Sequence, residues 1–90
     1  MNSMFDIFLR DAPVLVSAAL DAAGFMGDVD AMTCRNNGDE YTIAVRHRGD
    51  WYLEKAVCRK PKQVEDELPK MRAAIDEIAE GVVRQIAAVN

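Results

Sequence analysis

The stretch Tyr41–Arg59, YTIAVRHRGDWYLEKAVCR, decides the fold. Apolar and polar residues alternate on both sides of Arg48-Gly49-Asp50, which is the pattern of two strands joined by a tight turn. We expect a three-residue loop at these positions, because it places Val45 opposite Leu53. A two-residue loop that begins at Gly49 would instead set Val45 against Glu54. The segment therefore predicts a β-hairpin at the centre of the domain.

A further strand precedes this hairpin and is joined to it by Asn37-Gly38, two residue types that tolerate positive φ. A two-residue turn at these positions pairs Arg35 with Glu40, so that opposite charges meet across the strands. The inward face of the three strands is then expected to hold Met32, Cys34, Tyr41, Ile43, Val45, Trp51, Leu53 and Val57. Because side chains alternate between the two faces of a strand, Lys55 falls on the same face as Leu53 and Val57, so it must reach solvent from an edge of the sheet.

Helical segments flank the strands. Pro13 is unfavourable inside a helix, because it lacks the N–H group and clashes with the preceding turn. We therefore expect a short helix over Met4–Arg10 and a second over Ala12–Ala23, with Asp11 as N-cap and Gly24 as the stop. A longer helical segment follows the strands. Pro69 marks a kink or a restart in it, and the main helix is expected to run from there to about Ala88. The apolar seam of this segment is Val64, Leu68, Met71, Ile75, Ile78, Val82, Ile86 and Val89.

The expected fold class is α+β in the order α-β-β-β-α, with a three-stranded antiparallel meander and both helices on one face. Residues 1–90 are expected to form a single compact domain. This order is similar to that of double-stranded-RNA-binding domains, in which lysines at the start of the second helix grip phosphates. Lys60 and Lys62 stand at the analogous place, although residues 36–40 lack that family's Gly-Pro-x-His pattern.

The segment 12–23 is more apolar than a helix with one solvent-exposed face usually is, since Ser17 and Asp21 are its only polar residues after the first turn. Two arrangements would cover this surface. Either the two N-terminal helical pieces fold over one another, or the helix meets a second copy of the chain in a homodimer.

Composition excludes several classes of protein. The apolar fraction is 50% and the net charge is −4, which indicates a globular protein and argues against general binding to nucleic acid or anionic membranes. No apolar run is long enough to span a membrane, and no secretory signal is recognisable. We expect a cytoplasmic protein whose Cys34 and Cys58 stay reduced and unbridged, on outer strands roughly 9.6 Å apart and on opposite faces.

Catalytic residue types are few. His47 is the only histidine, and we expect it to be partly exposed and packed against Trp51. A zinc site needs more nitrogen and sulfur ligands than this histidine and two separated cysteines supply. The sequence therefore predicts no enzyme, no catalytic residues, no metal and no cofactor.

Charge is unevenly distributed along the chain. Residues 46–62 hold 6 basic and 2 acidic groups, whereas the segments before and after them are acidic. The favoured interpretation is a small acidic non-enzymatic protein-interaction module, such as an adaptor or an inhibitor that a phage or mobile element directs at a host protein complex. The alternative is a nucleic-acid-binding domain that uses the basic strip at 46–62. The candidate partner-binding residues are Arg46, Arg48, Tyr52, Arg59, Lys60, Lys62, Glu65, Asp66, Glu67, Asp76, Glu77 and Glu80.

Overall fold

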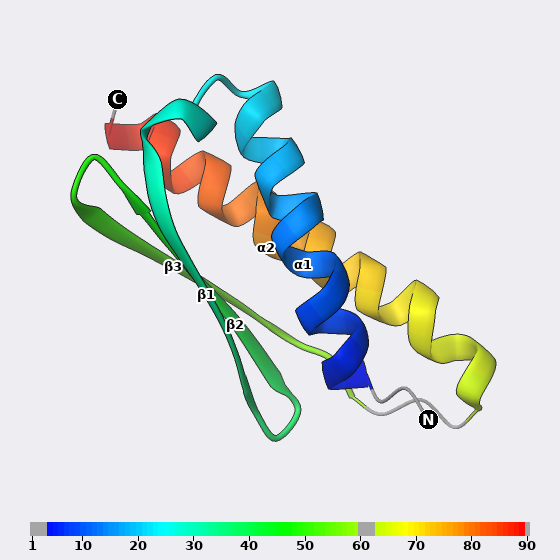
Figure 1. Ribbon diagram of the computed structural model, residues 1–90. Coiled ribbons are helices and arrows are strands. Elements are labelled where there is room, and N and C mark those ends of the chain that lie inside the picture. The colour runs from blue at the N-terminus through cyan, green and yellow to red at the C-terminus, as the bar shows by residue number, and fades with distance from the viewer. Residues whose placement is uncertain (1–3, 60–62, 90) are drawn as a thin grey trace.

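The computed structural model describes residues 4–59 and 63–89 and confirms the α-β-β-β-α order. The elements are α1 (Met4–Ala22), the 3-10 turn η1 (Met26–Asp28), β1 (Val29–Asn37), β2 (Glu40–His47), β3 (Asp50–Val57), the 3-10 turn η2 (Val64–Asp66) and α2 (Glu67–Val89). The strands form one antiparallel sheet in the order β1-β2-β3. Both helices lie against the same face of this sheet (Figure 1), as predicted.

Helix α1 is continuous, so the prediction of two helical pieces is wrong. Pro13 lies inside it, and Asp11, the expected N-cap, instead accepts a 2.8 Å hydrogen bond from its neighbour Arg10. The missing N–H of Pro13 is tolerated because Ala12 and Val16, on either side of it, are fully buried and hold the helix together. This apolar side packs within the chain, on α2 and β1.

The end of α1 is as predicted. Gly24 has φ +82°, and the Gly24 and Phe25 N–H groups donate to Asp21 O at 3.0 Å and Leu20 O at 2.8 Å. These two bonds make a Schellman motif, in which a glycine in the left-handed region satisfies the last helix carbonyls.

The turn between β1 and β2 lies one residue later than predicted. Its loop residues are Gly38 and Asp39, so Asn37 pairs with Glu40 and the register slips by two residues. Gly38 takes φ +70° at the first loop position, and Asp39 O accepts a 2.8 Å bond from Cys58 N–H. A slip of two leaves every side chain on its predicted face, because the side-chain period of a strand is two.

The turn between β2 and β3 overturns the prediction for β3. The loop has two residues, Arg48 at φ +52° and Gly49 at φ +85°, which suits the tight hairpin that a twisted sheet favours. The register differs by one residue from the three-residue loop, and therefore all β3 side chains change face. Tyr52 and Ala56 point into the core, while the predicted core residues Trp51, Leu53 and Val57 are 51%, 56% and 65% exposed.

The strain at Arg48 is compensated by contacts to η1. Arg48 N–H donates to Asp28 O at 3.1 Å, and Arg48 Nε donates to Asp28 Oδ2 at 2.9 Å. A non-glycine residue at positive φ costs on the order of 1–3 kcal/mol, and such a residue persists where its surroundings hold it. The observed register of β3 also places Lys55 on the outer face, rather than on the inward face that the sequence predicted. There its Nζ lies 3.7 Å from Glu40 Oε2.

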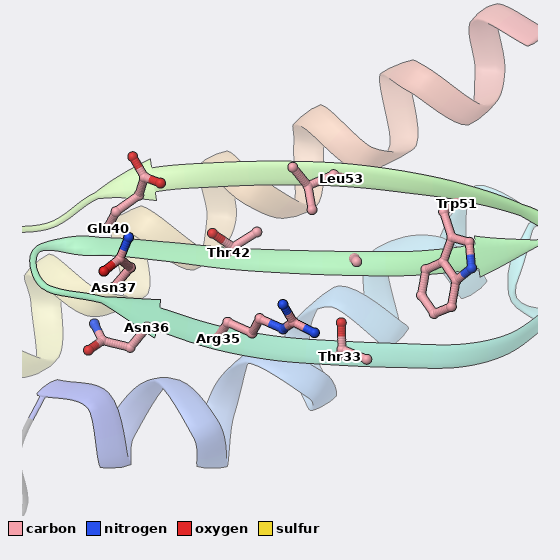
Figure 2. A pocket seen from close by; sticks show the side chains of 9 residues that line it. Thr33, Arg35, Asn36, Asn37, Glu40, Thr42, Trp51 and Leu53 are labelled. Atoms are coloured by element: carbon pink, nitrogen blue, oxygen red, sulfur yellow. The ribbon is translucent and has the colours of Figure 1, made fainter.

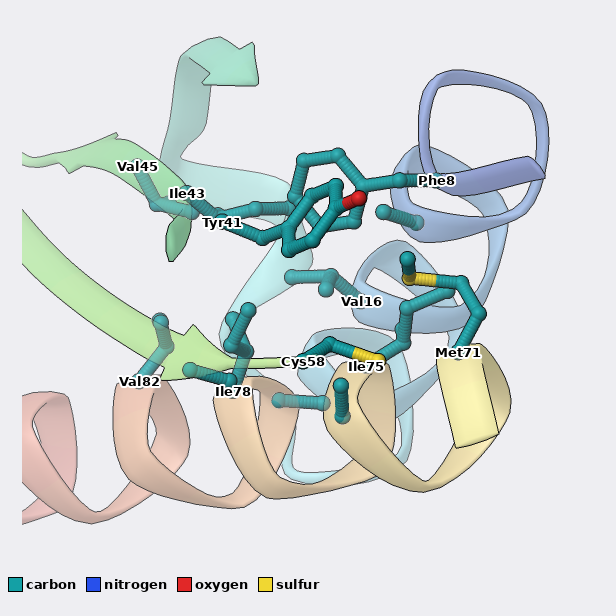
Figure 3. Packing of buried hydrophobic residues seen from close by; sticks show 14 of the residues in the cluster. Phe8, Val16, Tyr41, Ile43, Val45, Cys58, Met71, Ile75, Ile78 and Val82 are labelled. Carbon is teal, nitrogen blue, oxygen red and sulfur yellow. The ribbon is translucent and has the colours of Figure 1, made fainter. Parts of the chain in front are cut away.

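The core lies between the helices and the inner face of the sheet (Figure 3). Phe8 is fully buried, and its ring centroid is 5.0 Å from that of Tyr41 on β2. From α2, the predicted seam residues Met71, Ile75, Ile78, Val82 and Ile86 are all fully buried. Leu68 and Val89, at the two ends of the seam, are exposed, and the Val64 side chain lies outside the described part of the chain.

Gly81 of α2 is buried against β3, and an added Cβ would lie 2.8 Å from Glu54 Oε1 and closer still to Glu54 Cγ and Cδ. The Glu54 carboxylate is held by a hydrogen bond from Gln85 Nε2. We expect Gly81→Ala to lower the free energy of unfolding by about 1 kcal/mol, since overpacking outweighs the gain in helix propensity. In a Glu54→Ala background, the same change is expected to raise it by about 1 kcal/mol. Urea unfolding of the four proteins measures both effects, and equal effects in the two backgrounds would refute the clash.

Candidate functional site

The outer face of the sheet, opposite the helices, is the candidate site (Figure 1). In Figure 2, side chains from all three strands rise from this face around a shallow trough of about 680 Å³. Trp51 and Leu53 of β3 are its large apolar residues. Val57, also exposed, lies further along the same face of the strand, beyond Lys55. The trough is lined by Thr33, Arg35, Asn36, Asn37, Glu40, Thr42, Ala44, Trp51 and Leu53.

Two ion pairs neutralise most of the charge on this outer face. Arg46 donates from Nε and its second guanidinium nitrogen to Asp30 at 2.7 and 2.9 Å, and its Cζ lies 5.7 Å from the centre of the Trp51 ring. Lys55 pairs with Glu40. Arg35 is the remaining cation here for which no ion pair is seen among the described residues.

The hydrogen bonds from Arg46 hold the pKa of the Asp30 carboxyl below its usual value, and the pKa of Arg46 is raised in return. The stabilisation from a carboxyl with a lowered folded-state pKa is present above its unfolded pKa and is lost as pH falls through the folded one. We expect Arg46→Gln to raise the Asp30 pKa towards its ordinary value, as measured by NMR titration of the carboxyl. An Asp30 pKa that is the same in both proteins would contradict this pairing.

The predicted basic strip is not assembled as expected. Arg46 and Arg48 are each paired with an aspartate, and Tyr52, the aromatic residue predicted beside them, is buried. Arg59 is exposed, but it follows the far end of β3 from the Arg48-Gly49 turn. Lys60 and Lys62 lie outside the described residues.

The acidic candidates all belong to η2 and α2. Glu80 lies 3.8 Å from Arg84 one helical turn later, an exposed pair of little energetic consequence. Glu67 is half-buried, while Glu65, Asp66, Asp76, Glu77 and Glu80 are exposed. They lie on the helical side of the molecule, away from the outer face of the sheet.

His47 is 2% exposed, which corrects the prediction of a partly exposed residue against Trp51. The centroid of its ring lies 5.6 Å from that of Phe25 and 6.4 Å from that of Tyr52. Tyr52 takes the place predicted for Trp51 because the changed register of β3 turns Tyr52 inward. His47 Nε2 lies 4.0 Å from Asp28 Oδ2 and has no hydrogen-bond partner within the described structure.

Both cysteines are free, as predicted. Cys34 lies on β1 and Cys58 directly follows β3, so the two residues are placed at the two outer strands. The prediction that their side chains point to opposite faces of the sheet is wrong. Cys58 turns inward with the rest of the β3 register and is buried, while Cys34 is half-buried. Burial raises the pKa of both thiols, so neither is activated as a nucleophile.

Across residues 4–59 and 63–89, no three His, Cys, Asp or Glu side chains are grouped as a metal ion would require. Within the same residues, neither helix combines the length and apolarity needed to cross a membrane. Comparison with protein-family models, with curated proteins and with solved structures finds no match to this chain.

Proposed function

We propose that this protein is a non-enzymatic interaction module that binds another protein chain through the outer face of its sheet. The observation that carries the proposal is the group of exposed apolar side chains on that face: Trp51 and Leu53 are neighbours along β3, and Val57 lies beyond Lys55. Exposed apolar groups gathered on one face mark interaction sites more often than scattered ones do. Tryptophan in particular is enriched among the residues that dominate binding energy.

The charges on the outer face favour a protein over a nucleic acid as the partner. Nucleic-acid binding draws its affinity from cations that neutralise phosphates. Here Arg46 and Lys55 already have carboxylate partners, which phosphates would have to displace. Of the residues that the structure describes on this face, only Arg35 adds positive charge without an ion pair. Trp51, with Arg46 packed over its ring, belongs with Arg46 to the residue types that are enriched in protein interfaces.

An adaptor, or an inhibitor of a host protein complex, fits a module of this size and acidity. Its exposed acidic groups on α2 would remain available beside the sheet-bound partner. We further propose a cytoplasmic setting, which the two unbridged cysteines support.

Affinity capture with point variants tests the function. The full chain is immobilised and exposed to nuclease-treated lysate of its native host, with mass spectrometry identifying captured chains, whether copies of the protein itself or other proteins. Leu53→Lys places a charge in the outer face, and Val14→Lys is the matched control on α1, where Val14 is 67% exposed. We expect a stoichiometric chain that the wild type and Val14→Lys capture and Leu53→Lys does not. Capture that is unchanged by Leu53→Lys, or that is lost after nuclease treatment, would refute the proposal.

A further inference from the structure

We infer that the chain seated on the outer face is a second copy of this protein, and that the two sheets pack face to face around a two-fold axis. This rests on the proposed function, since it names the occupant of the same surface. The contact would place the Trp51, Leu53 and Val57 side chains of both protomers between two sheets, with a pair of helices on each outer side.

Charge makes this face compatible with itself. The protein carries a net charge of −4. Its outer face, by contrast, combines the pairs Arg46–Asp30 and Lys55–Glu40 with the single cation Arg35, among the described residues. Among the described residues each such face carries only the one uncompensated charge of Arg35, so two faces repel one another less than two copies of the acidic α2 surface would.

The size of the outer face agrees with the needs of a dimer. Strands β2 and β3 are each 8 residues long. The face is then roughly 26 Å long, and it is roughly 14 Å wide across three strands. Allowing for side-chain relief, two copies pressed together would bury about 1,000 Å² in total, which is the size of a weak, reversible interface.

Other modes of self-association are less suited to this structure. Joining two sheets edge to edge along β3 would need the main-chain oxygen of Leu53, which already accepts a 2.8 Å hydrogen bond from Gln85 Nε2 of the same chain. A dimer through α1, one of the two alternatives left open by the sequence, has little surface to use, since the apolar side of α1 is buried within the chain. Leu9 and Val14 are the large apolar residues that α1 leaves exposed.

The chain supplies its own reporter, because Trp51 is the only tryptophan and is half-exposed in the single chain. Purified full-length protein is studied by sedimentation equilibrium and tryptophan emission between about 1 and about 500 µM, a range that covers weak interfaces of this size. We expect a monomer–dimer equilibrium, with emission moving to shorter wavelength as the dimer forms.

The variants locate the interface. A two-fold contact uses Leu53 from both protomers, so Leu53→Lys is expected to weaken dimerisation by at least about 100-fold, while Val14→Lys leaves it unchanged. Circular dichroism checks that both variants are folded. A wild type that stays monomeric over the whole range, or a dimer that Leu53→Lys leaves intact, would overturn the inference.

The two failures can be told apart. If the wild type is monomeric but Leu53→Lys abolishes capture of a host protein, the second copy is refuted and the interaction function stands. If capture is indifferent to Leu53→Lys, the interaction function itself fails.

Discussion

Replacing Tyr52 with aspartate is expected to unfold the protein, whereas the same replacement at the adjacent Trp51 leaves it folded. Tyr52 is 9% exposed and packs against His47, so Tyr52→Asp would place a carboxyl group in the core and remove the ring that fills this space. Such a change costs several kcal/mol, a large part of the roughly 5–15 kcal/mol that stabilises a domain. Trp51→Asp, on the solvent face, is expected to cost at most about 1 kcal/mol.

Far-UV circular dichroism and urea unfolding of the two variants measure this difference. The pair of substitutions also decides the register of β3, because a three-residue loop would bury Trp51 and expose Tyr52. If Trp51→Asp unfolded the chain and Tyr52→Asp did not, the observed hairpin register would be refuted. Tyr52→Phe is the conservative control, and we expect it to retain the fold.

The order of elements could be predicted because it depends on local signals. Alternation marks the strands, the 3-and-4 spacing of α2 marks its buried seam, and Gly24 ends α1 through a glycine-specific conformation. The faces of β1 and β2 were also predictable. Their register error was an even number of residues, which keeps each side chain on its side of the sheet.

The face of β3 could not be predicted from local rules. It depends on whether Arg48 adopts positive φ, which turn preferences assign to glycine, asparagine and aspartate. The contacts that hold Arg48 there come from Asp28, 20 residues earlier in the chain. One signal of the error was present in the sequence, since the predicted register forced Lys55 onto the core face.

The candidate site changed for the same reason. Sequence reasoning assigned Trp51 and Leu53 to the core and Tyr52 to the surface, so the exposed apolar residues of the outer face were missed. Counting charges by segment also assigned Arg46 to a basic strip with its neighbours in the sequence, residues 46–62. In the folded chain, Arg46 is bound to Asp30, 16 residues away and across the sheet. Net charge by segment cannot reveal such neutralisation, because it depends on strand pairing.

Replacing Phe8 with alanine is expected to lower the free energy of unfolding by about 3–5 kcal/mol, the usual cost of removing a buried phenylalanine. Phe8 is fully buried, its ring packs at a tilt against that of Tyr41, and it joins α1 to the sheet, as Figure 3 shows. Leu9→Ala is the matched control, since Leu9 follows Phe8 on the exposed side of the same helix. Its expected cost is below about 1 kcal/mol.

Urea unfolding at two protein concentrations gives both values and separates burial within the chain from burial between chains. Because Phe8 contacts residues of its own chain, the difference between Phe8→Ala and the wild type should not depend on protein concentration. A loss that shrank as the protein was diluted would instead place Phe8 in an interface between copies. A cost for Phe8→Ala no greater than that for Leu9→Ala would contradict the packing of α1 on the sheet.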